Sequence, residues 1–157
     1  MSAPKKSLTT EQSLQKLRHY CGYQERCHSE VRDKLFRLEV AKKDHDAIIA
    51  SLIEEGYLNE ERFAIAFAGG KFRVKQWGKQ KIKHALLQKK VSEYSINKAL
   101  SKIESDEYGA VLKKLGEVKY ASLNQQQWAT RKSKTIDYLL QRGFEPELIN
   151  EVLEAVE

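Results

Sequence analysis

The stretch LLQKKV (residues 86–91) occurs three times in this sequence in recognisably similar form. Its counterparts are LFRLEV (residues 35–40), 51 residues earlier, and LLQRGF (residues 139–144), 53 residues later. Each copy ends on an apolar residue and is followed by a short polar break. A repeat period near 50 residues is typical of tandem helical arrays, in which each unit is a small bundle that packs on its neighbours.

Helical periodicity surrounds each copy. A longer helix is predicted before each stretch, over residues 10–24, 59–76 and 105–121. Thr10 is the expected N-cap of the first of these helices. A further amphipathic segment follows each stretch, and Gly56 is expected to end the one in the first unit as a C′ glycine. Each unit therefore contains three predicted helices.

We predict an all-α protein of three tandem three-helix repeats, with about nine helices in an elongated and curved array. The expected organisation is a flexible leader (1–9), a first repeat (10–56), a second, basic repeat (57–103) and a third repeat with an acidic C-terminal end (104–157). A monomer is the expected state of such an array.

The composition excludes several classes of protein. The 157 residues are 41% hydrophobic and 32% charged, which is too apolar for a disordered chain and too charged for a membrane protein. Neither a membrane span nor a signal peptide is apparent, so a cytoplasmic protein is expected. Cys21 and Cys27, flanked by His19 and His28, fit no common zinc spacing. Reduced cysteines, at least one of them packed as a small hydrophobe, are expected instead of a metal site.

The positive charge is concentrated in the middle of the chain. Residues 57–103 carry eleven basic and three acidic residues, a net charge of +8, whereas the first repeat has eight and nine and the third has seven and ten. No acidic residue lies between Glu61 and Glu93. A segment without compensating acids favours an anionic partner, since phosphates release counterions when cations neutralise them. The candidate basic face comprises Lys71, Arg73, Lys75, Trp77, Lys79, Lys81, Lys83, Lys89 and Lys90.

Aromatic residues interleave with these cations. Phe72, Trp77 and His84 could stack on bases or on a partner surface. The alternative is that Phe72 and Trp77 belong to the core and that the lysines only solubilise the segment. For Phe72 the core is the favoured interpretation, and for Trp77 both interpretations stay open.

No catalytic constellation is visible. The sequence contains no phosphate-binding glycine loop, no H-E-x-x-H and no G-x-S-x-G motif. Glu60 and Glu61 are better explained by the helix dipole, because they follow Asn59, the expected N-cap. We therefore expect a binding protein and not an enzyme, with no metal, nucleotide or organic cofactor.

The run GYLNEERFA (residues 56–64) resembles the G-Y-L-(D/N)-(D/E)-E-R-F-A signature of the RecX proteins, bacterial modulators of the RecA recombinase. Residues 26–35 are similar to the family's R-x-x-S-x-x-E-(L/V)-x-x-K-L pattern with altered gaps, and residues 73–86 to its R…G-x-x-x-I-x-x-x-L element. The sequence departs from the family where a glycine often precedes the closing apolar residue of each repeat: Glu39 and Lys90 stand there, and only Gly143 keeps it. The signature residues, expected to be mainly structural, are Gly56, Tyr57, Leu58, Glu61, Arg62, Phe63 and Ala64.

The resemblance implies a regulatory protein that binds RecA filaments and inhibits or modulates recombinase, ATPase and coprotease activity in DNA repair and the SOS response. Single- or double-stranded DNA within or near the filament is the implied second partner. Arg26, Arg32 and Arg62 are secondary contact candidates, although nearby acids offer them local partners; for Arg62 these are Glu54 and Glu55. The alternative function is a free-standing helical DNA-binding protein that does not depend on RecA.

Overall fold

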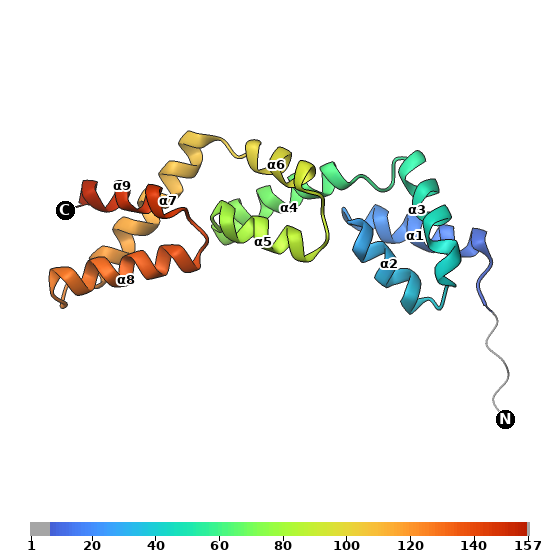
Figure 1. The fold of residues 1–157 in the computed structure, drawn as a ribbon, viewed down its shortest axis with the longest axis horizontal. Helices are drawn as coiled ribbons and strands as arrows, with labels where there is room; N and C mark the ends of the chain where they lie inside the picture. The colour runs from blue at the N-terminus through green and yellow to red at the C-terminus, as the bar shows by residue number, and fades with distance from the viewer. Residues whose placement is uncertain (1–6, 157) are drawn as a thin grey trace, which may run out of the picture.

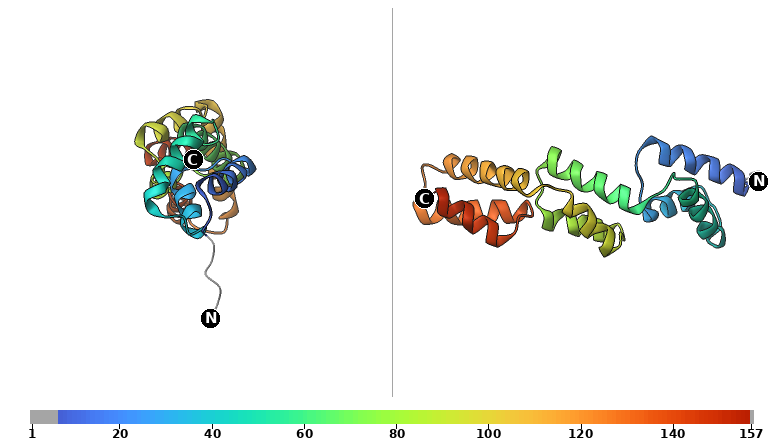
Figure 2. Two further views of the ribbon diagram at one scale, coloured as in Figure 1. Left: turned by 90° about the vertical axis from the view of Figure 1, so that its right-hand side faces the viewer. Right: turned by 90° about the horizontal axis from the view of Figure 1, so that it is seen from above.

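The computed structural model describes residues 7–156; residues 1–6 and 157 lie outside the described part. Within that part the chain forms nine α-helices and one 3-10 turn, and no strand. The helices follow one long axis, with the first and last helices at opposite ends of an elongated molecule (Figures 1 and 2). In chain order they are α1 (Thr10–Tyr23), α2 (His28–Arg37), η1 (Lys42–Asp44), α3 (His45–Glu54), α4 (Glu60–Lys75), α5 (Lys79–Gln88), α6 (Glu93–Ser101), α7 (Ser105–Ser122), α8 (Trp128–Gln141) and α9 (Pro146–Val156).

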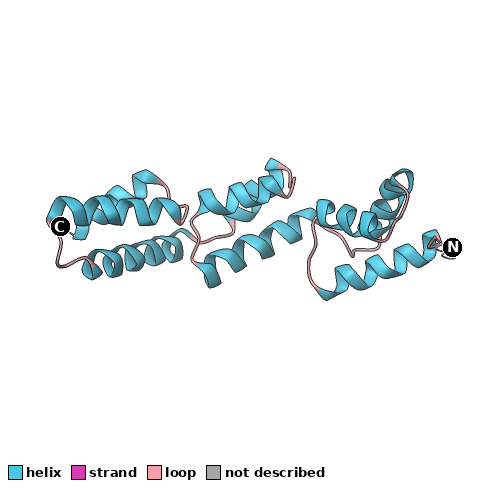
Figure 3. Ribbon diagram, turned by 90° about the horizontal axis from the view of Figure 1, so that it is seen from below, coloured by secondary structure: helices cyan, strands magenta, loops and turns pink. Residues whose placement is uncertain are grey.

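The predicted all-α fold is confirmed, and the helices group in threes along the axis (Figure 3). No helix in the described residues is long and apolar enough to cross a lipid bilayer. The first six residues of the predicted leader lie outside the described part, whereas Thr9 is ordered as a helix cap.

Side-chain caps fix where several helices begin. The hydroxyl of Thr9 accepts a hydrogen bond from the Gln12 amide, and the Gln12 side chain accepts one from the Thr9 amide. This capping box places the N-cap one residue before Thr10, so the prediction for that cap was wrong by one position. Asn59, the predicted cap of α4, accepts a hydrogen bond from the Arg62 amide at 2.8 Å.

The repeated stretch forms the same left-handed turn in all three units. Glu39, Lys90 and Gly143 have φ angles of 60°, 62° and 97°. In each case the next amide bonds back to the carbonyl five residues earlier, as Val91 N does to Leu86 O at 3.1 Å. This geometry is the Schellman motif, which ends a helix on a left-handed residue. Glu39 and Lys90 therefore adopt a backbone conformation that favours glycine.

Replacing Lys90 with glycine is expected to stabilise the protein by about 1 kcal/mol, because a side chain in the left-handed region costs roughly 1–2 kcal/mol. Lys83→Gly is the matched control: it removes a lysine from the interior of α5 and should cost about 1 kcal/mol. Urea denaturation followed by circular dichroism measures both variants. A loss of stability in Lys90→Gly equal to that of the control would contradict the assigned strain.

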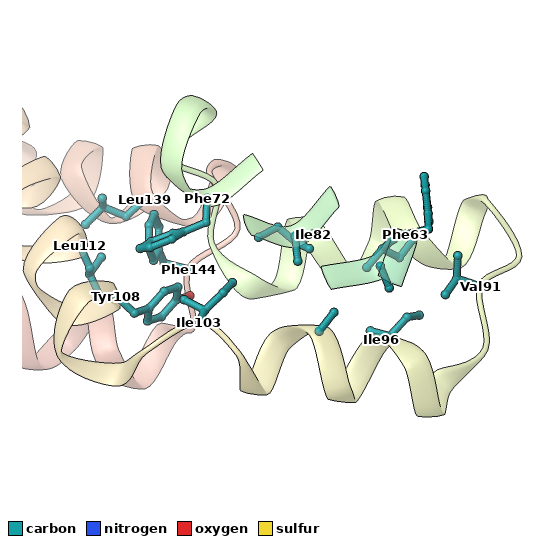
Figure 4. Packing of buried hydrophobic residues seen from close by; sticks show 14 of the residues in the cluster. Phe63, Phe72, Ile82, Val91, Ile96, Ile103, Tyr108, Leu112, Leu139 and Phe144 are labelled. Carbon is teal, nitrogen blue, oxygen red and sulfur yellow. The ribbon is translucent and has the colours of Figure 1, made fainter. Parts of the chain in front are cut away.

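The buried residues form two cores instead of three. The first core lies within α1–α3 and the residues that follow, and it contains Leu17, Leu35 and Leu52. The second core runs without interruption through α4–α9. Phe72, Tyr108 and Phe144 lie at its centre, with ring centroids 5.6 Å apart for Phe72 and Tyr108 and 5.2 Å apart for Tyr108 and Phe144 (Figure 4). The second and third helix triplets therefore share one hydrophobic interior.

Two glycines bring the second and third triplets into backbone contact. The Gly78 amide donates to Arg142 O at 2.7 Å, and the Gln80 amide donates to Gly143 O at 2.9 Å. A Cβ on Gly78 would lie 2.3 Å from the carbonyl carbon of Gly143, and one on Gly143 would lie 2.4 Å from the Cβ of Lys81. Neither position accommodates a side chain, so both glycines are required by this joint.

The joint between the first and second triplets occupies the equivalent place but is built from side chains. Cys27, the N-cap of α2, corresponds to Gly78, the N-cap of α5. Its side chain is buried in the core of the second triplet, and the Ser29 hydroxyl donates to Lys89 O at 2.7 Å. The ammonium of Lys89 also pairs with Glu30 at 3.3 Å. This explains why Cys27 behaves as a small hydrophobe, as the sequence predicted.

Candidate functional site

Three lysines gather around two half-buried aromatic rings on the second triplet. Lys71 Nζ lies 4.9 Å from the centroid of the Trp77 ring and 5.4 Å from that of Phe67. Lys81 Nζ lies 4.6 Å from the Trp77 ring, and Lys89 Nζ lies 5.9 Å from the Phe67 ring. We call Phe67, Lys71, Trp77, Lys81 and Lys89 the lysine–aromatic cluster. The ammonium groups are within the distance at which a ring face attracts a cation.

The turn between α4 and α5 positions this cluster. Gln76 has a φ of 55° and ends α4 in a left-handed conformation. The following amide, on Trp77, donates to Lys71 O at 3.1 Å. This bond holds the Trp77 ring beside the last turn of α4, where it meets Lys71. Arg142 donates to Lys75 O at 2.9 Å and so anchors the same turn to the third triplet.

The other five predicted basic residues lie outside the cluster. Arg73 lies 3.9 Å from Glu107 on α7, and Lys79 Nζ lies 4.9 Å from the ring of Tyr108. These two cations therefore face the third triplet. Lys75 and Lys90 are exposed and Lys83 is half-buried, and none of them forms an ion pair within residues 7–156. The positive charge of the segment thus spreads over more than one face.

Burial decides the role of the other aromatic candidates. Phe72 is 1% exposed and packs on Tyr108, so the possibility that it stacks on a base was wrong. The hydroxyl of Tyr108 accepts a hydrogen bond from the Lys79 amide at 3.0 Å and donates one to Glu145 at 2.7 Å. Burial, together with the bond to Glu145, raises the pKa of Tyr108 far above its usual value. Its role is to tie the second triplet to the third. Phe67 packs beside Phe63, with ring centroids 5.8 Å apart, and its ring also meets Lys71, a contact that the charge pattern did not reveal.

The secondary candidates Arg26, Arg32 and Arg62 are each engaged within the chain. Arg26 donates to Tyr20 O at 3.1 Å and its guanidinium lies 3.7 Å from the Tyr20 ring centroid. Arg32 pairs with Asp46 at 2.6 Å, and this hydrogen bond lowers the pKa of Asp46.

Arg62 bonds to Glu25 at 2.6 Å and to Gly56 O at 3.0 Å. The suggested pairing of Arg62 with Glu54 or Glu55 was therefore wrong, because Glu55 bonds to Arg18. Arg62 thus links the end of α1 to the start of α4.

Several residues of the stretch 56–64 pack into the chain or shape its backbone. Leu58, Phe63 and Ala64 are buried, and Gly56 has a φ of 82° that ends α3 as a C′ glycine. Glu61 lies half-buried in the first turn of α4. Tyr57 is 39% exposed and leaves part of its ring on the surface.

Both cysteines are buried and free. Burial raises the pKa of the Cys21 thiol to about 11 and also raises that of Cys27. In the part of the chain that the structure describes, no three histidine, cysteine, aspartate or glutamate side chains come together as metal ligands would.

Comparison with known families gives two matches that cover most of the second and third triplets. A profile described as RecX, second three-helix domain, matches residues 59–100. A second profile, described as RecX, third three-helix domain, matches residues 106–153. These ranges contain α4–α6 and α7–α9 almost completely.

Curated relatives named "Regulatory protein RecX" extend the similarity to the first triplet. The chain is 30% identical to one from Chlorobium phaeobacteroides over 86% of its own length and 87% of the relative. It is 27% identical to one from Lactobacillus gasseri over 98% of its own length but 56% of the relative. It is 32% identical to one from Clostridium perfringens over 79% of its own length and 58% of the relative. The chain thus spans about half the length of several curated relatives that it matches.

Solved structures share the fold. The crystal structure of RecX from Lactobacillus salivarius superimposes with a TM-score of 0.86 at 21% identity and covers 94% of this chain and 96% of that one. A crystal structure titled regulatory protein RecX gives a TM-score of 0.84 at 19% identity over 92% and 71% of the two chains. The arrangement of three helix triplets is therefore a known architecture.

Proposed function

Because this chain belongs to the RecX family, we propose that it binds RecA filaments and inhibits or modulates their recombinase, ATPase and coprotease activities. The action is stoichiometric binding and not catalysis, in a cytoplasmic setting of DNA repair and the SOS response. The relatives that carry this proposal are named regulatory proteins.

The lysine–aromatic cluster is the observation that supports a partner containing nucleic acid, such as a filament on DNA. Of its three lysines, only Lys89 forms an ion pair within residues 7–156, and its partner is Glu30. Lys71 and Lys81 instead rest on the rings of Phe67 and Trp77, which keeps their positive charge available to phosphates. Rings and cations side by side are the usual means of binding single strands without sequence preference.

The elongated shape and the unequal charge of the array support a filament as the partner. The second triplet is basic, whereas α9 and the residue before it carry Glu145, Glu147, Glu151 and Glu154. Glu157, the last acid of the predicted acidic end, lies outside the described residues. We propose that the basic part faces DNA or acidic RecA surface and that the acidic end faces basic protein surface.

The test is the ATPase activity of RecA on single-stranded DNA, titrated with this protein at several salt concentrations. Dose-dependent loss of activity is expected. Loss well below one copy per RecA indicates filament capping, and loss near equal amounts indicates coating of a groove. The control repeats the titration with excess single-stranded DNA. If the protein acts only by sequestering DNA, the excess DNA restores the ATPase activity of RecA. Unchanged ATPase activity with a protein shown to be folded by circular dichroism would contradict the proposal.

A free-standing DNA-binding protein is the second candidate. The lysine-rich composition of residues 71–90 favours phosphate contacts over base readout, which argues against recognition of a specific operator. Salt-dependent affinity for DNA in the absence of RecA, combined with full relief by excess DNA, would favour this candidate.

A further inference from the structure

A cavity of about 580 Å³ opens on the first triplet, between α1 and α2. It lies outside the lysine–aromatic cluster, and nothing in the proposed function uses it. Its size falls within the ~300–1,000 Å³ of clefts that hold small ligands. The lining side chains that matter here are Lys16, His19, Tyr20, Tyr23, Arg26 and Lys34.

The lining contains three cations and no carboxylate, although the first repeat as a whole has a net charge of −1. Ion pairs outside the cavity explain why its lining is positive although the repeat as a whole is slightly negative. Five acids of this repeat are held by arginines or lysines that do not line the cavity: Glu11 and Glu55 by Arg18, Glu25 by Arg62, Glu30 by Lys89, and Asp46 by Arg32. The cavity therefore keeps a positive charge that the overall count conceals.

Two tyrosines accompany these cations. The Tyr20 ring has the guanidinium of Arg26 at 3.7 Å and the ammonium of Lys34 at 5.5 Å from its centroid. Tyr23 is 80% exposed at the end of α1 and lines the same cavity. Cations on a ring combined with a freely exposed ring offer both charge neutralisation and a stacking surface.

We propose that this cavity binds an unpaired nucleotide of a single-stranded nucleic acid. The base stacks on tyrosine, and the phosphates are neutralised by Lys16, Lys34 and Arg26. A duplex does not offer the face of a base to Tyr23, since its bases already stack on one another. An acidic protein segment fits less well, because its affinity would depend on apolar anchors and Leu38 is the only aliphatic side chain in the lining.

The test compares Lys16→Ala/Tyr23→Ala with the unchanged protein, using fluorescence anisotropy of a labelled oligothymidylate of about 10 nucleotides, within the ~4–16 nucleotides of single-strand sites. Both side chains are exposed, so the fold is expected to be retained. Affinity should fall about 10-fold, because the variant can neither stack a base on Tyr23 nor neutralise a phosphate with Lys16. Tyr94→Ala/Lys98→Ala is the matched control: it removes an exposed tyrosine and lysine from α6, away from the cavity, and should leave the affinity unchanged.

Photo-crosslinking locates the base independently of affinity. An oligonucleotide that carries 5-iodouracil should form an adduct on the peptide that contains Tyr20 and Tyr23. Adducts confined to Trp77, or equal affinity of the variant and the unchanged protein, would overturn the proposal. An equal loss of affinity for duplex DNA in the variant would also overturn it. A variant that loses binding to RecA filaments but keeps its affinity for the oligonucleotide would overturn it too, and would point to an acidic protein segment as the ligand. RecA is absent from the oligonucleotide measurements, so their result is separate from that of the ATPase test.

Discussion

Gly78→Ala is expected to destabilise the protein by about 3 kcal/mol or more, which is the upper range for overpacking a tightly packed site. The added Cβ would lie 2.3 Å from the carbonyl carbon and oxygen of Gly143 and 2.4 Å from the Phe144 amide nitrogen. These neighbours are backbone atoms and cannot rotate away. The joint must therefore open, which strains the bonds from Gly78 to Arg142 and from Gln80 to Gly143. Urea denaturation followed by circular dichroism gives the change in free energy of unfolding.

Gly70→Ala is the control for this prediction. Gly70 lies within α4, and a Cβ there would meet no atom within 4 Å. This variant should gain about 0.5–1 kcal/mol, because alanine favours the helical conformation over glycine. Opposite signs for the two variants would identify the close approach as the cause. A loss at Gly78 no larger than about 0.5 kcal/mol would mean that the second and third triplets are not in backbone contact there.

The sequence predicted the helices well because their signals are local. The N-cap of α4 and the C′ glycine of α3 are set by Asn59 and Gly56, and neighbouring residues suffice to identify them. The left-handed turns at Glu39 and Lys90 were harder to predict, since neither residue favours that conformation. The similarity of their stretches to LLQRGF, which ends with Gly143 and Phe144, was the available signal.

The candidate site was less predictable because its geometry depends on which side of a helix each residue faces. Lys79 and Lys81 are two positions apart on α5, yet one lies over Tyr108 and the other beside Trp77. A count of charges along the chain cannot separate them. Arg62 and Glu25 form an ion pair across 37 positions, and no pattern in the sequence links the two. The cavity of the first triplet was not predictable for a similar reason, since acids paired elsewhere conceal its charge.

The fold also assigns different strengths to the two joints. Phe72, Tyr108 and Phe144 join the second and third triplets through one apolar core, whose strength changes little with salt. The first joint combines the buried Cys27 with ion pairs such as Lys89 with Glu30 and Arg62 with Glu25, and salt screens these ion pairs. The lysine–aromatic cluster lies on the second triplet, between these two joints. Both neighbouring triplets therefore help to hold it in place.

Reversing the charge of Lys71, Lys75 and Lys81 to glutamate is expected to weaken binding to RecA filaments on single-stranded DNA by on the order of 100-fold at ~0.1 M salt. Lys71 and Lys81 flank the Trp77 ring, and Lys75 lies one helical turn after Lys71 on the same side of α4. Lys89 is left unchanged, because a glutamate there would face Glu30 and damage the first joint. The slope of log affinity against log salt should fall by about 2, roughly 0.7 for each of the three phosphates on a single strand that the variant no longer neutralises.

The matched control reverses Lys102, Lys114 and Lys134, three exposed lysines that have no contact with Phe67 or Trp77. Both variants change the net charge by six units, so a difference between them reports position and not total charge. Equal weakening in both would mean that the filament responds only to overall charge, and the cluster would have no special role. Weaker binding by the cluster variant without a change in the salt slope would indicate that the lysines bind protein instead of phosphate, because only phosphates release condensed counterions.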